Sequence, residues 1–143
     1  MPFPPRGRSW RVLVLQRSLT TRCPGAWETV HGRLEHGETP HAAAIRELRE
    51  ETGLAPDRLY NVTPHGFYLH KQATVAIAVV FCAFVTGTPR ITLGEEHSRC
   101  QWLSRADAMK RFVWPAEREH LARAWALLKR GHAGPVEDAL RII

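Results

Sequence analysis

Three glutamates, Glu47, Glu50 and Glu51, have the residue type and the spacing that could do chemistry together. On an α-helix, which turns by about 100° per residue, they fall within one stripe about 100° wide. Two carboxylates about 5 Å apart in a partly buried cleft repel each other by roughly 3 kcal/mol. A divalent cation bound between them would remove that repulsion. Because the stripe offers hard oxygen donors and no His or Cys, it predicts a site for Mg²⁺ or Mn²⁺ rather than for zinc.

The segment that carries these glutamates is predicted to be a helix from about residue 40 to residue 52. Thr39 is a good N-cap, Pro40 suits the first helical position, and Gly53 ends the pattern. The predicted helix therefore begins directly after a loop and places all three acids in its second half.

This helix is predicted to have two different faces. Ile45 and Leu48 fall opposite the acids, where they could pack into the core. Arg46 lies one turn before Glu50 and could form an i,i+4 ion pair that fixes that carboxylate. The alternative is a solvated charged face, which is what most charge runs are. The one-sided clustering of the acids behind a glycine-bounded loop, residues 32–38, argues against that alternative.

The rest of the chain alternates short strands with a few helices, and this mixture predicts an α/β or α+β sandwich. The strands are expected at residues 10–16, 27–31, 61–69, 74–85 and 99–103, and further helices at residues 104–112 and 115–130.

Length and composition describe one globular domain. The 143 residues are 44% hydrophobic and 24% charged, proportions that exclude a disordered chain. Residues 1–143 are therefore expected to form a single domain, with residues 1–8 and 132–143 as flexible ends. The longest apolar run, residues 75–85, suits a buried strand and is too short to span a membrane.

The N-terminal sequence, the cysteines and the net charge indicate in which compartment the protein is expected and which partners it is expected to have. The N-terminus lacks the apolar stretch and the small-residue cleavage site of a secretory signal. The three cysteines have no CxxC spacing and imply neither a disulfide framework nor a zinc site. We therefore expect a cytoplasmic location and no membrane partner. The net charge of +6 would suit a polyanion, but the basic residues are scattered, so nucleic acid is not expected as a partner.

The acidic helix is part of a longer pattern with fixed spacing. Gly32 is followed after five residues by Glu38, and after seven more by residues 46–54, which read RELREETGL. This segment resembles the signature of the Nudix hydrolases, G-x5-E-x7-R-E-U-x-E-E-x-G-U, in which U is a bulky aliphatic residue. All nine constrained positions match. The resemblance implies the α/β/α sandwich of that family, with a mixed central sheet, over the whole chain.

Nudix enzymes hydrolyse a nucleoside diphosphate linked to another moiety, and the resemblance implies roles by position. The implied metal ligands are the backbone carbonyl of Gly32 and the carboxylates of Glu47, Glu50 and Glu51. The same glutamates, with Arg46, form the implied catalytic set, and one of them is a candidate general base. Glu38 and Arg46 would support the loop and the carboxylates.

Looser motifs around this box are similar to one branch of the family. They are W-x-x-V-x-G at residues 27–32, E-H-x-x-x-x-W at residues 96–102, and W-x-x-x-R at residues 114–118. The pattern looks like that of the dihydroneopterin triphosphate (dATP) pyrophosphohydrolases, which release pyrophosphate from a nucleoside or pterin triphosphate. The resemblance therefore implies a triphosphate substrate.

Some residues outside the box are candidates with an open alternative. Glu96, on an expected loop, could reach the metals or act as a base, and a solvated loop carboxylate is the alternative. Phe67, Tyr68 and Trp114 could stack on a flat base or pterin, although a core position is the commoner role of such residues. Arg118 could contact phosphates, although a surface role is the commoner one for a single arginine.

The function predicted from the sequence is that of a Mg²⁺-dependent Nudix pyrophosphohydrolase. Its substrate is expected to be a (deoxy)nucleoside triphosphate or dihydroneopterin triphosphate, cut to the monophosphate and pyrophosphate. ADP-ribose or another nucleoside diphosphate derivative is the enzymatic alternative, and an oxidised nucleotide is a third substrate to consider. A catalytically silent nucleotide- or RNA-binding module is the alternative of another class, but no box glutamate is missing. Because Nudix enzymes are often dimers, a homodimer is a further prediction.

Overall fold

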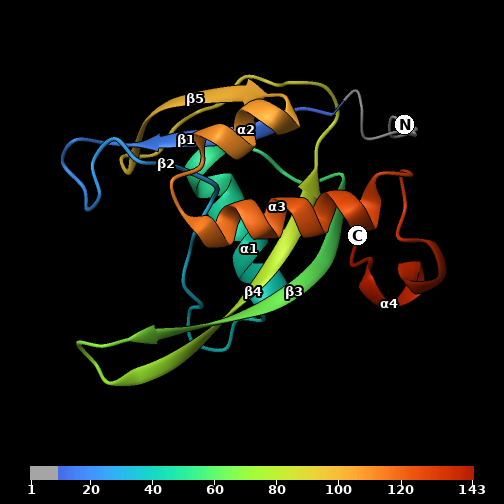
Figure 1. Ribbon diagram of the computed structural model, residues 1–143, viewed down its shortest axis with the longest axis horizontal. Coiled ribbons are helices and arrows are strands. Elements are labelled where there is room, and N and C mark those ends of the chain that lie inside the picture. The colour runs from blue at the N-terminus through green and yellow to red at the C-terminus, as the bar shows by residue number, and fades with distance from the viewer. Residues whose placement is uncertain (1–9) are drawn as a thin grey trace.

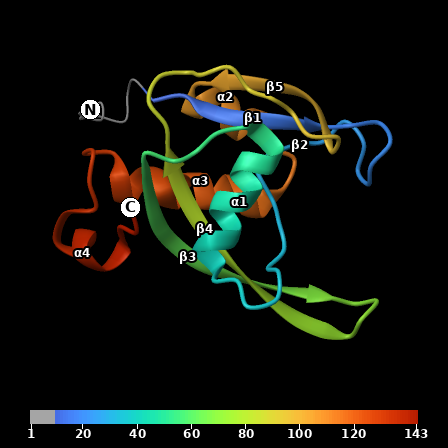
Figure 2. The ribbon, with the colours of Figure 1, turned by 180° about the vertical axis from the view of Figure 1, so that it is seen from behind.

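The computed structural model describes residues 10–143, which form two antiparallel sheets with helices around them (Figure 1). One sheet has three strands in the order β2-β1-β5, and the other consists of β3 and β4. Helix α3 lies in front of β3 and β4 in Figure 1, and α1 lies in front of them from the opposite side (Figure 2). The chain is therefore a sandwich of helices and strands, as predicted, with the two-stranded sheet between two helices.

The strands lie close to where the sequence predicts them, with shifted ends. The three-stranded sheet contains β1 (Val12–Arg17), β2 (Trp27–Glu28) and β5 (His97–Leu103), and the long hairpin consists of β3 (Arg58–Leu69) and β4 (Thr74–Phe84). The strand predicted at residues 27–31 is thus only two residues long, whereas β3 and β5 begin earlier than predicted.

The strand pairing differs from the predicted mixed central sheet. Every strand pair among residues 10–143 is antiparallel: β1 with β2, β1 with β5, and β3 with β4. The loop between β2 and α1 adds no strand, because side chains bind its backbone donors. The Thr29 N–H donates to Glu117 at 2.6 Å, and the Glu35 N–H donates to Glu38 at 3.0 Å. The described chain therefore has two antiparallel sheets in place of one mixed sheet.

The helices are α1 (Pro40–Thr52), α2 (Arg105–Arg111), α3 (Pro115–Leu128), a 3₁₀ turn η2 (Gly134–Val136) and α4 (Glu137–Leu140). Helices α1, α2 and α3 begin within a residue of the predicted helix starts, whereas η2 and α4 lie in the tail that the sequence predicts to be flexible. The Ser104 hydroxyl caps α2 by accepting a hydrogen bond from the Asp107 N–H at 3.2 Å. Within the described chain, no helix is both long and apolar enough to cross a membrane.

Two clusters of buried apolar side chains fix the helices on the sheets. In the first, Val14 of β1 and Trp27 of β2 pack with Phe112, which ends α2. In the second, Tyr60 of β3 packs with Leu128 in the last turn of α3. Since burial of such side chains is the main favourable term in folding, these clusters fix the end of α2 against β1 and β2, and the last turn of α3 against β3.

The C-terminal residues, for which the sequence predicts a flexible end, contact β3. The Tyr60 hydroxyl donates a hydrogen bond to Glu137 at 2.9 Å, and the Ile142 N–H donates to the Leu59 carbonyl at 2.7 Å. Both β3 residues are buried, so the tail is tied to the interior end of the strand. The other predicted flexible end, residues 1–8, lies outside the described residues.

Truncating Leu128 tests the packing of α3 on β3. Leu128 is 1% exposed, so Leu128→Ala is expected to lower the free energy of unfolding by about 2–5 kcal/mol through lost burial and a cavity. Leu19 is 86% exposed, and Leu19→Ala should change it by less than about 0.5 kcal/mol. Urea denaturation of both variants measures the difference. Equal midpoints for the two would contradict the placement of α3.

Candidate active site

Helix α1 is closed at both ends by the residues that the sequence singles out. The Thr39 hydroxyl accepts a hydrogen bond from the Ala42 N–H at 3.3 Å. Gly53 adopts the left-handed conformation, with φ of 77°, and its N–H donates to the Arg49 carbonyl at 2.8 Å. A side chain would be strained at that φ, which is why glycine ends the helix. The predicted helix boundaries are confirmed, and the three acids occupy the last two turns.

Burial along α1 is different from the prediction. Ile45 and Leu48 are only half-buried, whereas Glu51 and Thr52 are buried. The physical reason is the loop between β4 and β5, which covers the last turn of α1. In that loop, the Thr92 N–H donates to the Thr52 carbonyl at 2.9 Å. One of the predicted cleft acids therefore lies beneath a loop rather than on an open helix face.

Arg46 is the residue that binds the acidic groups together. Its Nε and Nη2 donate to the two carboxylate oxygens of Glu38 at 2.8 and 3.0 Å. Its Nη1 donates to Glu47 at 2.8 Å and to Glu50 at 3.1 Å, which is the predicted i,i+4 pair. Nη2 also donates to the Arg33 carbonyl at 2.8 Å. One guanidinium thus holds the preceding loop and two helix carboxylates in a fixed arrangement.

Gly32 and Glu47 are in direct contact. A Cβ atom placed on Gly32 would overlap the Cγ and carboxyl carbon of Glu47. Any larger residue at position 32 would therefore displace the Glu47 side chain. The structure brings the Gly32 backbone and the Glu47 carboxylate side by side, as a shared set of metal ligands would require.

Glu51 is the most perturbed acid of the site. Its side chain is buried, and its Oε2 atom has no hydrogen-bond partner among the described residues. Burial, together with the nearby carboxylates of Glu96 and Glu47, raises the pKa of Glu51 to about 8. The Gly94 N–H, which donates to the Glu51 carbonyl at 3.3 Å, helps to hold the loop that carries Glu96. The charge of the exposed Glu96 therefore acts on Glu51, and its role at the metals stays a prediction.

The oxygen atoms of these residues are of the kind that a divalent cation prefers, but the side chains do not converge on one point. No three His, Cys, Asp or Glu side chains of residues 10–143 already form a metal-binding group. Glu47 is bound to Arg46, and the side chain of Glu50 is 55% exposed. The fit comes from the hard oxygen donors, the excess negative charge and the unpaired buried oxygen of Glu51. A metal ion that bound these carboxylates would have to displace the hydrogen bonds that Arg46 makes with Glu47 and Glu50.

Sequence reasoning missed two buried glutamates, each next to a histidine. Glu28 of β2 accepts hydrogen bonds from Arg17 and lies 3.3 Å from Nε2 of His97. Burial acts to raise the pKa of Glu28, but the His97 hydrogen bond and the positive charges of His31 and Arg17 outweigh it and leave that pKa lowered. His97 directly follows Glu96. Glu28 therefore anchors the strand end beside a candidate active-site acid.

The second missed residue is Glu117, in the first turn of α3. Its Oε2 accepts the Thr29 N–H at 2.6 Å and lies 3.3 Å from Nε2 of His31. The hydrogen bond between the His31 ring and Glu117 raises the pKa of His31. Both missed glutamates lie inside the looser motifs at residues 27–32 and 114–118, so those motifs were the available signal. The spacing of residues along the sequence does not show which residues of two distant motifs come into contact.

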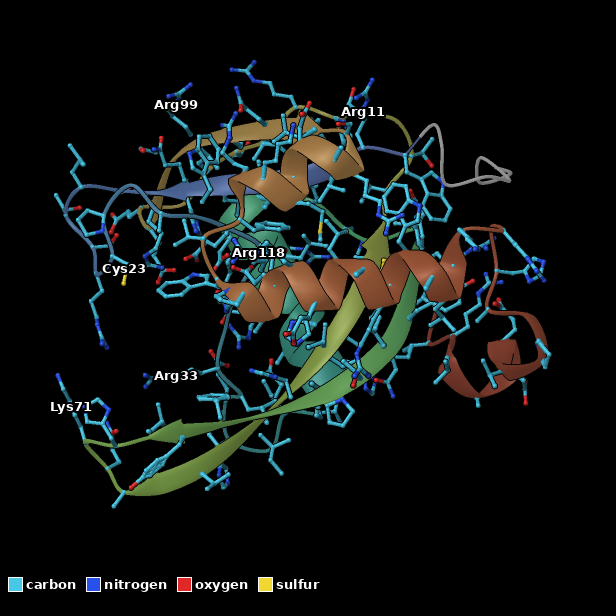
Figure 3. The ribbon with its side chains drawn as sticks, in the orientation of Figure 1. Arg11, Cys23, Arg33, Lys71, Arg99 and Arg118 are labelled. Atoms are coloured by element: carbon cyan, nitrogen blue, oxygen red, sulfur yellow. The ribbon has the colours of Figure 1, made fainter. Side chains whose placement is uncertain are left out.

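The predicted substrate-binding residues fall into two groups. Trp114 and Arg118 flank Glu117 at the start of α3, and Arg118 Nη1 donates to the Phe112 carbonyl at 2.7 Å (Figure 3). Phe67 and Tyr68, 40% and 59% exposed, lie far along the β3–β4 hairpin, near the turn that carries Lys71 (Figure 3). The first group thus lies next to Glu117, which binds the loop before α1 through the Thr29 N–H.

Comparison with known proteins gives the family. A family model described as the NUDIX domain matches residues 2–124. The chain belongs to the Nudix family. Two of its relatives are named as 8-oxo-dGTP diphosphatases, one of them as putative.

The relatives differ in length and in name. The chain is 30% identical over 115 residues to a putative 8-oxo-dGTP diphosphatase 2 of Mycobacterium tuberculosis, covering 80% of this chain and 79% of that protein. It is 34% identical over 123 residues to an octanoyltransferase of Myxococcus xanthus, covering 85% of this chain but 34% of that protein. The chain thus spans about a third or less of several curated relatives that it matches.

Among solved structures, the dihydroneopterin triphosphate pyrophosphohydrolase of E. coli is similar to this Nudix chain. The identity is 26% and the TM-score is 0.63, with 78% of this chain and 82% of that chain covered.

Removing Arg46 should free Glu38. The hydrogen bond from Arg46, followed by that from the Glu35 backbone, lowers the pKa of Glu38 to about 2. Because the folded pKa lies below the ordinary value, this pair stabilises the fold above about pH 4.5 and the contribution is lost as the pH falls towards 2. In Arg46→Ala the Glu38 pKa should rise towards the ordinary value but stay below it, because the Glu35 N–H still donates to the carboxylate. An NMR titration of the Glu38 carboxyl measures it, and an unchanged value would contradict the pairing.

Metal binding should depend on pH through Glu51. Its folded pKa of about 8 exceeds the ordinary 4.5, so without metal the free energy of unfolding should fall, on the order of a few kcal/mol at most, as the pH rises between these values. Mg²⁺ should therefore raise the melting temperature more at pH 8.5 than at pH 6, where a proton competes for Glu51. Calorimetry in Mg²⁺ and in EDTA measures both shifts. Glu51→Gln should remove the pH dependence, and equal shifts in the wild type would contradict the assignment.

Proposed function

We propose that this Nudix chain is a Mg²⁺- or Mn²⁺-dependent pyrophosphohydrolase that cuts a nucleoside triphosphate or dihydroneopterin triphosphate to the monophosphate and pyrophosphate. The observation that carries the proposal is the acidic cluster of α1. Glu47 and Glu50 are held by one guanidinium, while the neighbouring Glu51 is buried with an unpaired oxygen. Such an arrangement is unfavourable by itself and becomes favourable when a cation binds.

The chain supplies positions and proton acceptors for the reaction. A divalent metal ion, when bound, neutralises phosphate oxygens and activates water for attack on phosphorus. Glu47, Glu50 and Glu51 would hold it together with the Gly32 carbonyl. Arg46 orients the first two of these carboxylates, and a carboxylate such as Glu96 would accept the proton of the attacking water. Displacement at phosphorus depends mostly on this kind of positioning and charge stabilisation.

The names of the relatives support a triphosphate substrate. A putative 8-oxo-dGTP diphosphatase matches four-fifths of the chain, and a dihydroneopterin triphosphate pyrophosphohydrolase shares its fold at 26% identity. An oxidised purine triphosphate therefore ranks beside the ordinary nucleotides and the pterin. Hydrolysis of ADP-ribose is the enzymatic alternative, and it differs in releasing no pyrophosphate. A silent binding module is disfavoured because every acid of the box is present.

Location and assembly belong to the same proposal. We infer a cytoplasmic enzyme that acts on small phosphorylated substrates, without a membrane or nucleic acid partner. The homodimer stays a prediction, and the apolar side chains exposed on the β3–β4 hairpin, such as Val75 and Ile77, are compatible with it.

A product assay tests the proposal. The wild-type chain with Mg²⁺ is expected to release pyrophosphate and a monophosphate from at least one of dATP, 8-oxo-dGTP and dihydroneopterin triphosphate, and EDTA should abolish the reaction. Chromatography of the products measures this. AMP and ribose 5-phosphate from ADP-ribose, with all triphosphates intact, would overturn the substrate class but not the Nudix chemistry.

Matched variants in the same assay separate catalysis from stability. Glu50→Gln and Glu51→Gln should each lower kcat by at least about 100-fold, since each removes a charged ligand. Glu119→Gln, an exposed position of α3, should leave kcat unchanged within about twofold. Wild-type turnover in either box variant would contradict the metal assignment.

A further inference from the structure

Glu117 is a buried carboxylate for which the proposed reaction has no direct use. It is 5% exposed, its Oε2 accepts the Thr29 N–H at 2.6 Å, and it pairs with His31 at 3.3 Å. Its Oε1 is buried without a hydrogen-bond partner among the described residues. Burial of an ionisable group is unfavourable unless hydrogen bonds or an ion pair compensate for the lost hydration.

The segment that Glu117 binds leads directly to the metal-ligand candidates. Thr29 and His31 precede Gly32, whose Cα touches the Glu47 side chain. The backbone of His31 lies close enough to the Glu51 carboxylate to act to lower its pKa. Two of the three glutamates of α1, Glu47 and Glu51, therefore lie beside residues 29–32.

This segment has little other support. Strand β2 ends at Glu28, so residues 29–32 are not part of a strand ladder among the described residues. The side chain of His31 is 55% exposed. Arg46 holds the next residue of the loop through the Arg33 carbonyl at 2.8 Å, so without Glu117 this segment would be held against α1 mainly from that one side.

Glu117 itself is held by a firm frame. It lies in the first turn of α3, where the Arg118 side chain donates to the Phe112 carbonyl at 2.7 Å and the Val113 N–H donates to the Trp27 carbonyl at 3.2 Å. Phe112 and Trp27 belong to a buried cluster. A carboxylate on such a frame can fix a loop to within the tolerance that a metal site requires.

We propose that Glu117 is a positioning residue, which acts through the Thr29 amide and His31 to hold Gly32, Glu47 and Glu51 in place for the divalent metal. The inference rests on the proposed function for its metal and deepens it by adding a group outside the box. In this role, Glu117 binds neither the oxygen atoms of the proposed metal ligands nor the substrate.

Two conservative variants separate position from charge. Glu117→Gln keeps the length of the side chain and an oxygen that can accept the Thr29 N–H, but it loses the charge. Glu117→Asp keeps the charge but is one methylene shorter, so it withdraws from the Thr29 N–H. Positioning is therefore retained in the first variant and lost in the second, whereas a long-range electrostatic role would give the opposite order.

The test measures Mn²⁺ binding by the whole chain, using the electron paramagnetic resonance signal of free Mn²⁺, alongside kcat and KM. Glu117→Asp is expected to weaken Mn²⁺ binding by about 10–100-fold and to lower kcat, with KM within about threefold of the wild type. Glu117→Gln should stay within about threefold of the wild type in all three quantities. Glu119→Asp and Glu119→Gln, on the exposed side of the same helix, are the matched controls and should change nothing.

Melting curves establish that each variant is folded before binding is compared. Wild-type Mn²⁺ affinity in Glu117→Asp would overturn the inference, as would weakened binding in Glu117→Gln alone. A raised KM with unchanged Mn²⁺ affinity would instead make Glu117 a substrate contact and would also overturn it. If no triphosphate is hydrolysed but Mn²⁺ binding follows the expected order, the proposed substrate fails while the positioning role holds.

Discussion

Repulsion between the carboxylates of α1 is the constraint around which the site is organised. Three acids within five residues of one helix cannot all be ionised and close together without a counter-charge. Arg46 supplies that charge to Glu47 and Glu50, because its planar group carries enough donors to bind Glu38 and the loop at the same time. A lysine, with one compact ammonium group, could not make these separate contacts. Glu51 is left outside this arrangement, and burial, with the charges of Glu96 and Glu47, raises its pKa.

The loops around α1 are held by buried carboxylates of a different kind. Glu28 and Glu117 come from separate elements, yet each binds a histidine that adjoins a candidate ligand residue. His97 follows Glu96 in sequence, and His31 precedes Gly32. The Glu28–His97 pair holds the end of the loop between β4 and β5. The Glu117–His31 pair holds the loop before α1. The acids proposed to bind metal are therefore flanked by loops that two other, buried acids hold in place.

The box and its helix could be predicted from the sequence because local rules determine them. The caps at Thr39 and Gly53 and the i,i+4 pair of Arg46 with Glu50 depend only on residues a few positions apart. The burial of Glu51 could not be predicted, since it results from a loop some 40 residues further along the chain. The same holds for the Glu117 to Thr29 contact, which joins residues 88 positions apart. Periodicity describes which side of a helix is apolar, but not which long loop will cover its polar side.

Helix α3 couples the core to the site and to the predicted substrate surface. Its last turn carries Leu128, packed on Tyr60, while its first turn carries Glu117 between Trp114 and Arg118. A helix of 14 residues is about 21 Å long and moves as a rigid rod, so a shift at either end is transmitted to the other. Residues that hold the loop before α1 and residues that could meet a base or phosphate therefore share one turn. A change in how α3 packs on β3 would therefore be expected to act on the proposed metal ligands and on the predicted substrate surface together.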